Sequence, residues 1–126
     1  MDLPDSVEIK PSPLHEKGVF ATQDIPAHSC LGSFTGMEYS LKDFKEKYGK
    51  DIRYCYQLGR LNKIICAKEQ RNFITYINES EKPNCYLKRR SCWTARDIKK
   101  GEELFLSYNK KGMIKYPRDY ELQSHS

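Results

Sequence analysis

The sequence predicts one small domain of the mostly β, β-rich α+β class. The chain has 126 residues, which suits a single domain and leaves no room for a second. Short apolar runs separated by turn residues outnumber the one clear helical pattern, which favours several small sheets. Hydrophobic residues make up 38% of the chain and charged residues 31%, a balance typical of a globular protein.

The first strands are expected where short apolar runs stop at turn residues. Residues 7–10 alternate and then meet Pro11-Ser12-Pro13, which is a turn signal. Residues 19–21 form a second apolar run after Gly18, and residues 30–35 form a third after the interruption at Pro26. These runs predict three short strands in the first quarter of the chain.

One helix is expected over residues 40–48. Ser40 is a suitable N-cap, and Asp43 places a negative charge in the first turn, where the helix dipole favours it. Gly49 is placed to end the helix, because glycine accepts the left-handed conformation common at that position.

The second half of the chain predicts hairpins and one short helical turn. Residues 53–58 and 61–67 flank Gly59-Arg60 and are expected to form a hairpin. A helical turn is expected at residues 73–77. Further strands are expected at residues 86–90, 92–95 and 104–108. The lysine and glutamate pairs on either side of Gly101 are interpreted as a polar turn, with Glu102-Glu103 solvating it.

Charge and cysteine usage exclude some classes of protein. The net charge is +5, and the tightest basic cluster is Lys88-Arg89-Arg90, which leaves nucleic acid open as a ligand. The five cysteines are odd in number and form no C-x-x-C pair, so reduced thiols are expected, without a disulfide framework or a zinc site. The polar first ten residues do not fit a signal peptide, and no apolar run is long enough to span a bilayer.

Three separated segments together resemble the motifs of the SET domain family. Residues 16–21, Glu-Lys-Gly-Val-Phe-Ala, resemble the G-x-G-V-F-A stretch near the start of these domains. Residues 64–67, 72–80 and 83–85 resemble the D-A, G-N, R-F-I-N-H-S and P-N-C series. Residues 98–109 resemble the closing G-E-E-L-x-x-x-Y. The order and spacing are those of the family, and a compact virus-encoded SET protein has a similar minimal, stand-alone layout.

The resemblance implies a fold and an activity. The fold is a SET domain of several small sheets, one or two short helices and a knot-like C-terminal crossing, with a core at about residues 7–109. The activity is S-adenosylmethionine-dependent methylation of a protein lysine, with a histone tail as the most familiar substrate. Methyl transfer from a sulfonium to an amine is a direct displacement, so alignment matters more than acid-base groups. An apolar channel favours the neutral lysine by desolvation.

The resemblance also implies roles for the residues that would perform the transfer. Tyr108 matches the closing tyrosine, whose hydroxyl points at the methyl and the target amine. Tyr54 matches an aromatic of the lysine channel, and Tyr56 is expected to line the same channel. Leu106 stands where relatives often carry the Phe or Tyr that limits the number of methyl groups. Core or edge-strand packing is the alternative reading of these tyrosines.

A second group of residues is expected to bind the cofactor. Asn78 matches an asparagine that contacts the cofactor through its amide, and the backbone of Glu79 is expected to contact the adenine. The backbone of residues 16–18, Glu16, Lys17 and Gly18, matches the loop around the methionine end. Tyr116, in the basic and aromatic tail of residues 110–126, is expected to close over the adenine by stacking. No metal is expected, because no cysteine follows Cys92.

The sequence departs from the family pattern at three positions. Glu16 replaces the first glycine of G-x-G, Glu79 replaces the histidine of N-H-S, and Thr75 replaces the arginine before them. These departures keep a second hypothesis open, namely a catalytically silent SET- or PR-like module that binds protein or nucleic acid. An unrelated basic β domain that binds nucleic acid is a third.

Partners and location follow from the first hypothesis. The expected partner is a protein with a target lysine, with nucleosomal DNA at Lys88-Arg89-Arg90 and a homodimer as further expectations and no role for a membrane. The expected location is the nucleus, the host nucleus for a viral protein, or the cytoplasm, without secretion.

Overall fold

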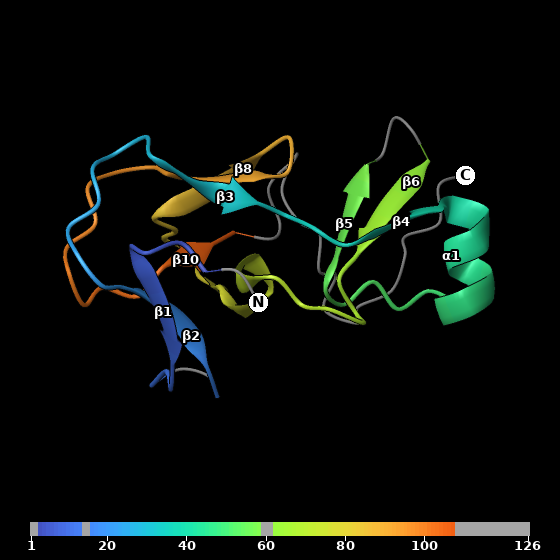
Figure 1. Ribbon diagram of the computed structural model, residues 1–126, viewed down its shortest axis with the longest axis horizontal. Coiled ribbons are helices and arrows are strands. Elements are labelled where there is room, and N and C mark those ends of the chain that lie inside the picture. Colours follow the sequence, from blue (N-terminus) through green and yellow to red (C-terminus); the bar gives the residue numbers. More distant parts are fainter. Residues whose placement is uncertain (1–2, 14–15, 59–61, 108–126) are drawn as a thin grey trace.

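The computed structural model describes residues 3–13, 16–58 and 62–107, and within them it forms four small sheets (Figure 1). Two sheets have three strands and two have two strands. The strands and helices are β1 (Val7–Lys10), β2 (Gly18–Ala21), β3 (Cys30–Ser33), β4 (Met37–Ser40), α1 (Leu41–Tyr48), β5 (Cys55–Leu58), β6 (Lys63–Cys66), the 3-10 helix η2 (Phe73–Tyr76), β7 (Asn78–Glu79), β8 (Cys85–Lys88), β9 (Ser91–Thr94) and β10 (Phe105–Leu106). The prediction of a β-rich α+β fold of several small sheets is confirmed.

Strand β2 carries the first motif and is fully buried. It pairs with β1 in antiparallel register on one side. On its other side it contacts residues 101–104, where the Ala21 amide donates to the Glu102 carbonyl at 2.9 Å and the Leu104 amide donates to the Val19 carbonyl at 2.7 Å. The closing motif therefore lies beside the opening motif, more than eighty positions away in the sequence.

The sheet β3-β9-β8 forms the middle of the molecule. Cross-strand pairing of Lys88 with Ser91 leaves Arg89 and Arg90 as a two-residue turn, with φ values of 57° and 101°. Such positive φ values are characteristic of tight hairpin turns and are usually supplied by Asn or Gly. The sequence prediction extended the first strand through Arg90, and the structure corrects this boundary because β-strand geometry requires negative φ.

Residues 37–66 form a helical lobe, made of β4, α1, β5 and β6, at one end of the molecule (Figure 1). Helix α1 begins as predicted, because the Ser40 hydroxyl accepts from the Asp43 amide at 3.1 Å. Gly49, with φ of 66°, follows the helix and donates its amide to the Lys45 carbonyl. The sequence analysis did not predict β4, an edge strand whose residues are exposed or half-buried and lack a clear apolar alternation.

The closing strand β10 runs parallel to β7, with Phe105 opposite Asn78 and Leu106 opposite Glu79. The Ser80 amide donates to the Leu106 carbonyl at 2.9 Å, and the Asn84 amide donates to the Phe105 carbonyl at 3.2 Å. Residues 105–106 are thus bonded to both ends of the bend at residues 78–84, which is the crossing expected from the family resemblance. Of the strand predicted at residues 104–108, β10 forms at Phe105–Leu106, and residue 108 lies outside the described residues.

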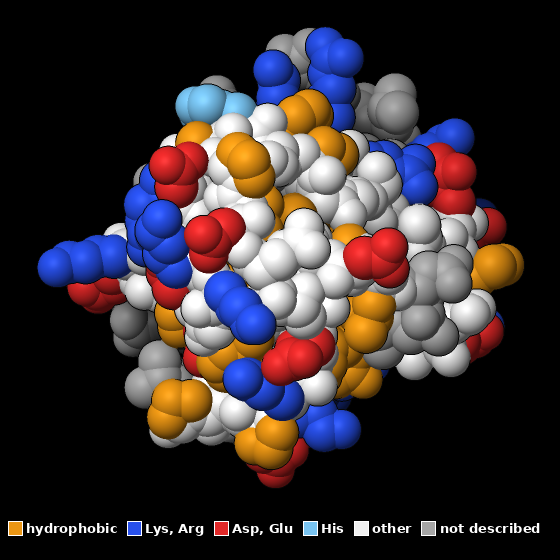
Figure 2. Space-filling view, turned by 60° about the vertical axis from the view of Figure 1, so that its left-hand side comes forward, with side chains coloured by type: hydrophobic (Ala, Val, Ile, Leu, Met, Phe, Trp, Pro, Cys, Tyr) orange, Lys and Arg blue, Asp and Glu red, His pale blue; other side chains and the backbone are white. Residues whose placement is uncertain are grey.

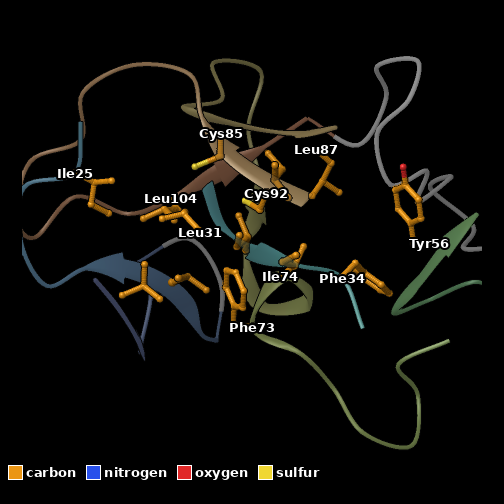
Figure 3. Close-up of a cluster of buried hydrophobic side chains, with 14 of the residues drawn as sticks. Ile25, Leu31, Phe34, Tyr56, Phe73, Ile74, Cys85, Leu87, Cys92 and Leu104 are labelled. Atoms are coloured by element: carbon orange, nitrogen blue, oxygen red, sulfur yellow. The ribbon is translucent and has the colours of Figure 1, made fainter. Parts of the chain in front are cut away.

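The described residues bury two separate apolar clusters. The larger one joins the sheet β3-β9-β8 to η2 and to the closing segment, and includes Phe34, Ile74 and Leu104, each 0% exposed (Figure 3). The smaller cluster lies in the helical lobe around Phe44, Ile52 and Ile64. No helix among the described residues is long and apolar enough to cross a membrane.

Candidate functional site

Gly18 is the point of closest approach between the opening and closing motifs. A Cβ atom at this position would clash with the Glu103 carboxylate and would lie 3.1 Å from Asn78 Nδ2. The need for glycine here is one of space, because these neighbours occupy the volume that any side chain would need. Lys17, Gly18, Asn78 and Glu103 are called the motif junction below.

Asn78 holds the junction together through its side-chain amide. Its Nδ2 donates to the Lys17 carbonyl at 2.9 Å and to Glu103 Oε2 at 2.8 Å. A primary amide has two N–H bonds, and both are used by these contacts. The amide oxygen, Oδ1, accepts no hydrogen bond from the residues that the structure describes, so it remains able to accept one from a ligand.

Glu103 was missed by the sequence analysis, which assigned Glu102-Glu103 to the solvation of a turn. Glu102 does serve the turn, because it accepts from the Lys99 amide at 3.0 Å. Glu103 turns to the junction, where it accepts from Asn78 and, at 2.9 and 3.1 Å, from the Ser12 hydroxyl. Only the pairing of residues 101–104 with β2 reveals this role, and no local pattern in the sequence predicts that pairing.

Asn84 fixes the closing segment beside the junction. It is 1% exposed, its Nδ2 donates to the Glu103 carbonyl at 2.9 Å, and its Oδ1 accepts from the Phe105 amide at 2.7 Å. One side chain therefore satisfies two backbone groups about twenty residues away. A buried backbone group without a partner is costly, so this asparagine is a structural requirement of the crossing.

Tyr54 lies at a different place, beside Arg71 and Tyr76. The guanidinium carbon of Arg71 is 3.9 Å from the Tyr54 ring centre and 3.8 Å from the Tyr76 ring centre, which is cation–π geometry. The same guanidinium donates to Thr75 Oγ1 and to the Thr75 carbonyl, each at 3.0 Å. Arg71 thus brings a guanidinium to Thr75, the position at which the family resemblance expects arginine.

The remaining predicted site residues do not gather in one place. Tyr56 and Leu106 are buried in the larger core, where the Tyr56 ring lies 5.9 Å from that of Phe34. Burial raises the pKa of the Tyr56 hydroxyl, so it stays protonated near neutral pH. Glu16 and Glu79 are exposed. Tyr108 and Tyr116 lie outside the described residues.

A cavity of about 660 Å³ opens elsewhere, between the end of β3 and the segment that follows β6. None of the predicted site residues in the described part of the chain lines it. Its walls include Leu31, Phe73, Arg71 and Cys66, and it is also bordered by Leu3 and Met37, which are exposed large apolar side chains. The described residues contain no group of three or more His, Cys, Asp or Glu side chains that could hold a metal ion.

Surface charge is mixed on the face shown in Figure 2, where acidic and basic side chains are interspersed. The described ion pairs are all between exposed or partly exposed side chains, such as Lys47 with Glu69 at 2.8 Å and Arg96 with Glu102 at 3.3 Å. Pairs of this kind contribute little to stability.

Comparison with known proteins matches residues 16–109 to the SET domain family. The histone-lysine N-methyltransferase MEDEA of Arabidopsis thaliana is 29% identical over 109 residues, which are 77% of this chain and 16% of MEDEA. The methyltransferase domain of human PR domain-containing protein 2 superimposes with a TM-score of 0.63 at 28% identity, covering 86% of this chain and 80% of that one.

A larger assembly gives a similar result. A chain of the Chaetomium thermophilum polycomb repressive complex 2, in an autoinhibited conformation bound to S-adenosylmethionine, superimposes with a TM-score of 0.74 at 22% identity. The alignment covers 92% of this chain and 16% of that one, so the present chain spans about one-sixth of the length of these relatives. The matched residues run from the loop before Gly18 to the end of the closing motif, and this chain therefore belongs to the SET domain family.

Proposed function

We propose that this chain is an S-adenosylmethionine-dependent protein lysine N-methyltransferase. The observation that carries the proposal is the motif junction, in which Gly18 and Asn78 meet although sixty residues separate them in the sequence. Family membership supports it, because the residues matched to the SET domain include the whole junction.

The chemistry of the junction suits the ammonium group of S-adenosylmethionine. Three oxygen acceptors lie together there, namely the Lys17 carbonyl, Asn78 Oδ1 and the Glu103 carboxylate. An ammonium group carries three donors and a positive charge, and charge-assisted hydrogen bonds to such acceptors are the stronger kind. When bound, the cofactor supplies an electrophilic methyl group on a sulfonium.

The chain's own residues would orient the reactants and exclude water. Asn78, held by Lys17 and Glu103, would present its oxygen in one orientation only. Tyr108 is proposed to orient the target amine with its hydroxyl, and Tyr54, with its ring against Arg71, is proposed to line the lysine channel. Such alignment is the main contribution a protein can make to a direct displacement.

The proposed substrate is a histone tail, and the proposed location is the nucleus. MEDEA is a histone-lysine N-methyltransferase, and the chain is 29% identical to it. Nucleosomal DNA at Lys88-Arg89-Arg90 and a homodimer stay predictions. The three cations 88–90 are exposed, and none of them forms an ion pair with a carboxylate of the described residues.

Calorimetric titration with S-adenosylmethionine tests the first half of the proposal. We expect binding by the full chain, loss of binding in Gly18→Ala because the added methyl displaces Glu103 and Asn78, and weakening in Asn78→Ala. The exposed amide variant Gln23→Ala is the matched control and should bind as the parent does. Circular dichroism of each variant separates lost binding from lost folding.

Radiolabelled methyl transfer to histones and to an array of lysine peptides tests the second half. We expect transfer by the parent chain and its loss in Tyr108→Phe with cofactor binding retained. Binding without transfer to any protein would reject the enzyme and leave the second candidate, a silent SET- or PR-like module. That candidate is favoured by Glu16 and Glu79, exposed carboxylates at two positions where the family resemblance expects Gly and His.

A further inference from the structure

Two cysteines face each other across adjacent strands of the helical lobe. Cys55 in β5 is the direct cross-strand partner of Cys66 in β6, and both are free thiols. They lie in the smaller core with Phe44 and Ile64, below helix α1, and are 3% and 4% exposed. The proposed methyl transfer makes no use of them.

The register places this pair at a position where a disulfide fits. The Ala67 amide donates to the Tyr54 carbonyl at 2.8 Å, so Tyr54 and Ala67 form a hydrogen-bonded pair of the antiparallel ladder. The next pair, Cys55 and Cys66, is therefore of the non-hydrogen-bonded kind, in which Cα atoms lie about 4.5 Å apart. That separation falls within the range that a disulfide spans, roughly 4.4–6.8 Å.

Cys66 differs from its partner in access and charge. It is one of the residues that line the 660 Å³ cavity, whereas Cys55 does not line it. The Cys55 thiol donates to the Arg53 carbonyl at 3.4 Å. The contact with Cys55, together with the Lys68 amide and ammonium, lowers the pKa of the Cys66 thiol against the effect of burial. The contact with Cys66 and burial raise the pKa of the Cys55 thiol.

The charged groups around the pair act in both directions. Lys68, with a side chain 14% exposed, pairs with Asp51 at 3.4 Å and favours the Cys66 thiolate. Glu69 opposes that thiolate, and Asp51 opposes ionisation of Cys55. Tyr48 of α1 also faces Cys66 and has its own pKa raised, so it remains neutral. Position relative to the cavity, which Cys66 lines and Cys55 does not, therefore distinguishes the two thiols.

We propose that Cys66 is a peroxide-reactive thiol and Cys55 its resolving partner, so that a hydroperoxide converts the pair into a cross-strand disulfide. The Cys66 thiolate attacks the peroxide oxygen and becomes a sulfenic acid, and one water leaves after proton transfer. The Cys55 sulfur then attacks the Cys66 sulfur and a second water leaves. Two thiols lose two electrons and two protons in total, and one hydrogen peroxide becomes two waters.

A second pair of adjacent cysteines provides an internal comparison. Cys85 and Cys92 are also in contact and buried, but they are not direct cross-strand partners, because Cys85 faces Thr94 and Cys92 faces Leu87. Neither lines the cavity. The contact with Cys85 and burial raise the pKa of the Cys92 thiol well above its ordinary value. This pair should resist oxidation.

The experiment is timed oxidation of the folded full chain with hydrogen peroxide at pH 7, followed by peptide mapping. Cys30 is exposed and would add background, so Cys30→Ser is the parent for all variants. Trypsin separates the two cysteines into the peptides 54–60 and 64–68. We expect these two peptides to be linked by a disulfide, with a mass two hydrogens below the sum of the separate peptides. The Cys85 and Cys92 thiols should remain free.

Variants distinguish the two roles. In Cys55→Ser, Cys66 should stop at the sulfenic acid and be captured by a cyclic 1,3-dione, whereas Cys66→Ser should leave Cys55 reduced. We expect Cys66 in the Cys55→Ser variant to react at least about tenfold faster than Cys55 in the Cys66→Ser variant, because only Cys66 lines the cavity. Cys92→Ser is the matched control and should oxidise as the parent does.

The proposal would be overturned if peptides 54–60 and 64–68 stay separate while Cys85 and Cys92 join, or if all buried cysteines react equally. Mapping of the parent chain decides this without any variant, so misfolding of a variant cannot hide the answer. Neither readout involves S-adenosylmethionine or methyl transfer. A negative result in this experiment therefore does not bear on the proposed methyltransferase function. A negative result for methyl transfer likewise does not bear on the proposed thiol oxidation.

Discussion

The helical lobe and the motif junction are built in opposite ways. In the lobe, the sheet and the helix come from one stretch of the chain, between residues 37 and 66, with Ser40 and Gly49 at the ends of α1. In the junction, three separate segments meet through side-chain hydrogen bonds of Asn78, which span 61 residues to Lys17 and 25 residues to Glu103. The lobe has an apolar core of its own around Phe44, although its Tyr56 and Ile65 belong to the larger core.

This difference shows which kind of structure local patterns can specify. Capping residues and apolar spacing act within a few residues, so they form the lobe in any context that covers its apolar face. The junction requires the closure of long loops. Its hydrogen bonds stabilise the fold only when all of its polar groups are brought together. A substitution in the junction should therefore destabilise the lobe less than it destabilises the junction itself.

The largest expected effect is that of Phe44→Ala in the core of the lobe. Phe44 is 0% exposed, and removal of a buried phenylalanine ring costs about 3–5 kcal/mol. If the two cores are separate, amide exchange should rise in β4, β5 and β6 while β8 and β9 keep their protection. An equal rise in all five strands would show that the two regions unfold as one unit.

Asn84→Ala should have the next largest effect, and it should act on the junction. The change leaves the Glu103 carbonyl and the Phe105 amide without their partner, which costs about 2–3 kcal/mol. Urea denaturation measures the loss, with the exposed amide variant Gln70→Ala as control. A loss as small as that of the control would mean that water replaces the Asn84 side chain and that the crossing is not held by this residue.

Ser40→Ala sharpens the comparison at a smaller scale, because it removes only the cap of α1. Loss of a serine N-cap costs about 1 kcal/mol, and we expect the loss to be confined to the lobe. Thermal denaturation followed by circular dichroism measures it. Ser91→Ala, which removes an exposed hydroxyl contact with Ser33, should change stability by less than Ser40→Ala does.

The smallest expected effect is a pH dependence from Glu102 at the turn before β10. Its bond from the Lys99 amide, with Arg96 nearby, lowers the pKa of the Glu102 carboxyl. Because the pKa of Glu102 is lower in the folded protein, its ionised carboxylate stabilises the fold fully above the unfolded-state pKa of about 4.3. This stabilisation is lost as the pH falls through the folded-state pKa. Glu102→Gln should therefore flatten the stability curve below about pH 5.

Glu46→Gln, on the exposed side of α1, is the control for that measurement. The urea midpoint is measured at neutral pH and near pH 3 for each protein. The difference between the midpoints of Glu102→Gln and the parent should be smaller near pH 3 than at neutral pH. For the control, the difference from the parent should be the same at both pH values. Parallel curves for both variants would show that the turn gains nothing from the ionised carboxylate.

Local patterns predicted much of the fold and part of the junction. The ends of α1, the strand β1 and the hairpin β5–β6 follow from a cap, a turn tripeptide and a pair of apolar runs. Edge strand β4 and the two-residue strand β7 were not predicted, because neither shows a clear alternation of apolar and polar residues.

The candidate site divides in the same way. Asn78 and Gly18 were identified from motifs, whereas Glu103 and Arg71 were missed because their partners lie in other elements or in a stacked arrangement. Arg71 could not be recognised as the guanidinium beside Thr75 without coordinates, since the sequence shows only that the arginine expected at position 75 is absent.

By itself, the sequence determined which residues cap the helix, where the turn after β1 falls and which motifs are present, since each of these depends on neighbours within a few positions. Only the tertiary structure decided that Glu103 faces Asn78, that Asn84 satisfies the closing strand and that Cys55 lies opposite Cys66. The physical reason is that pairing between distant segments depends on the arrangement of the whole chain. The hydrogen bonds and contacts of each of these side chains depend on which distant segment packs against it.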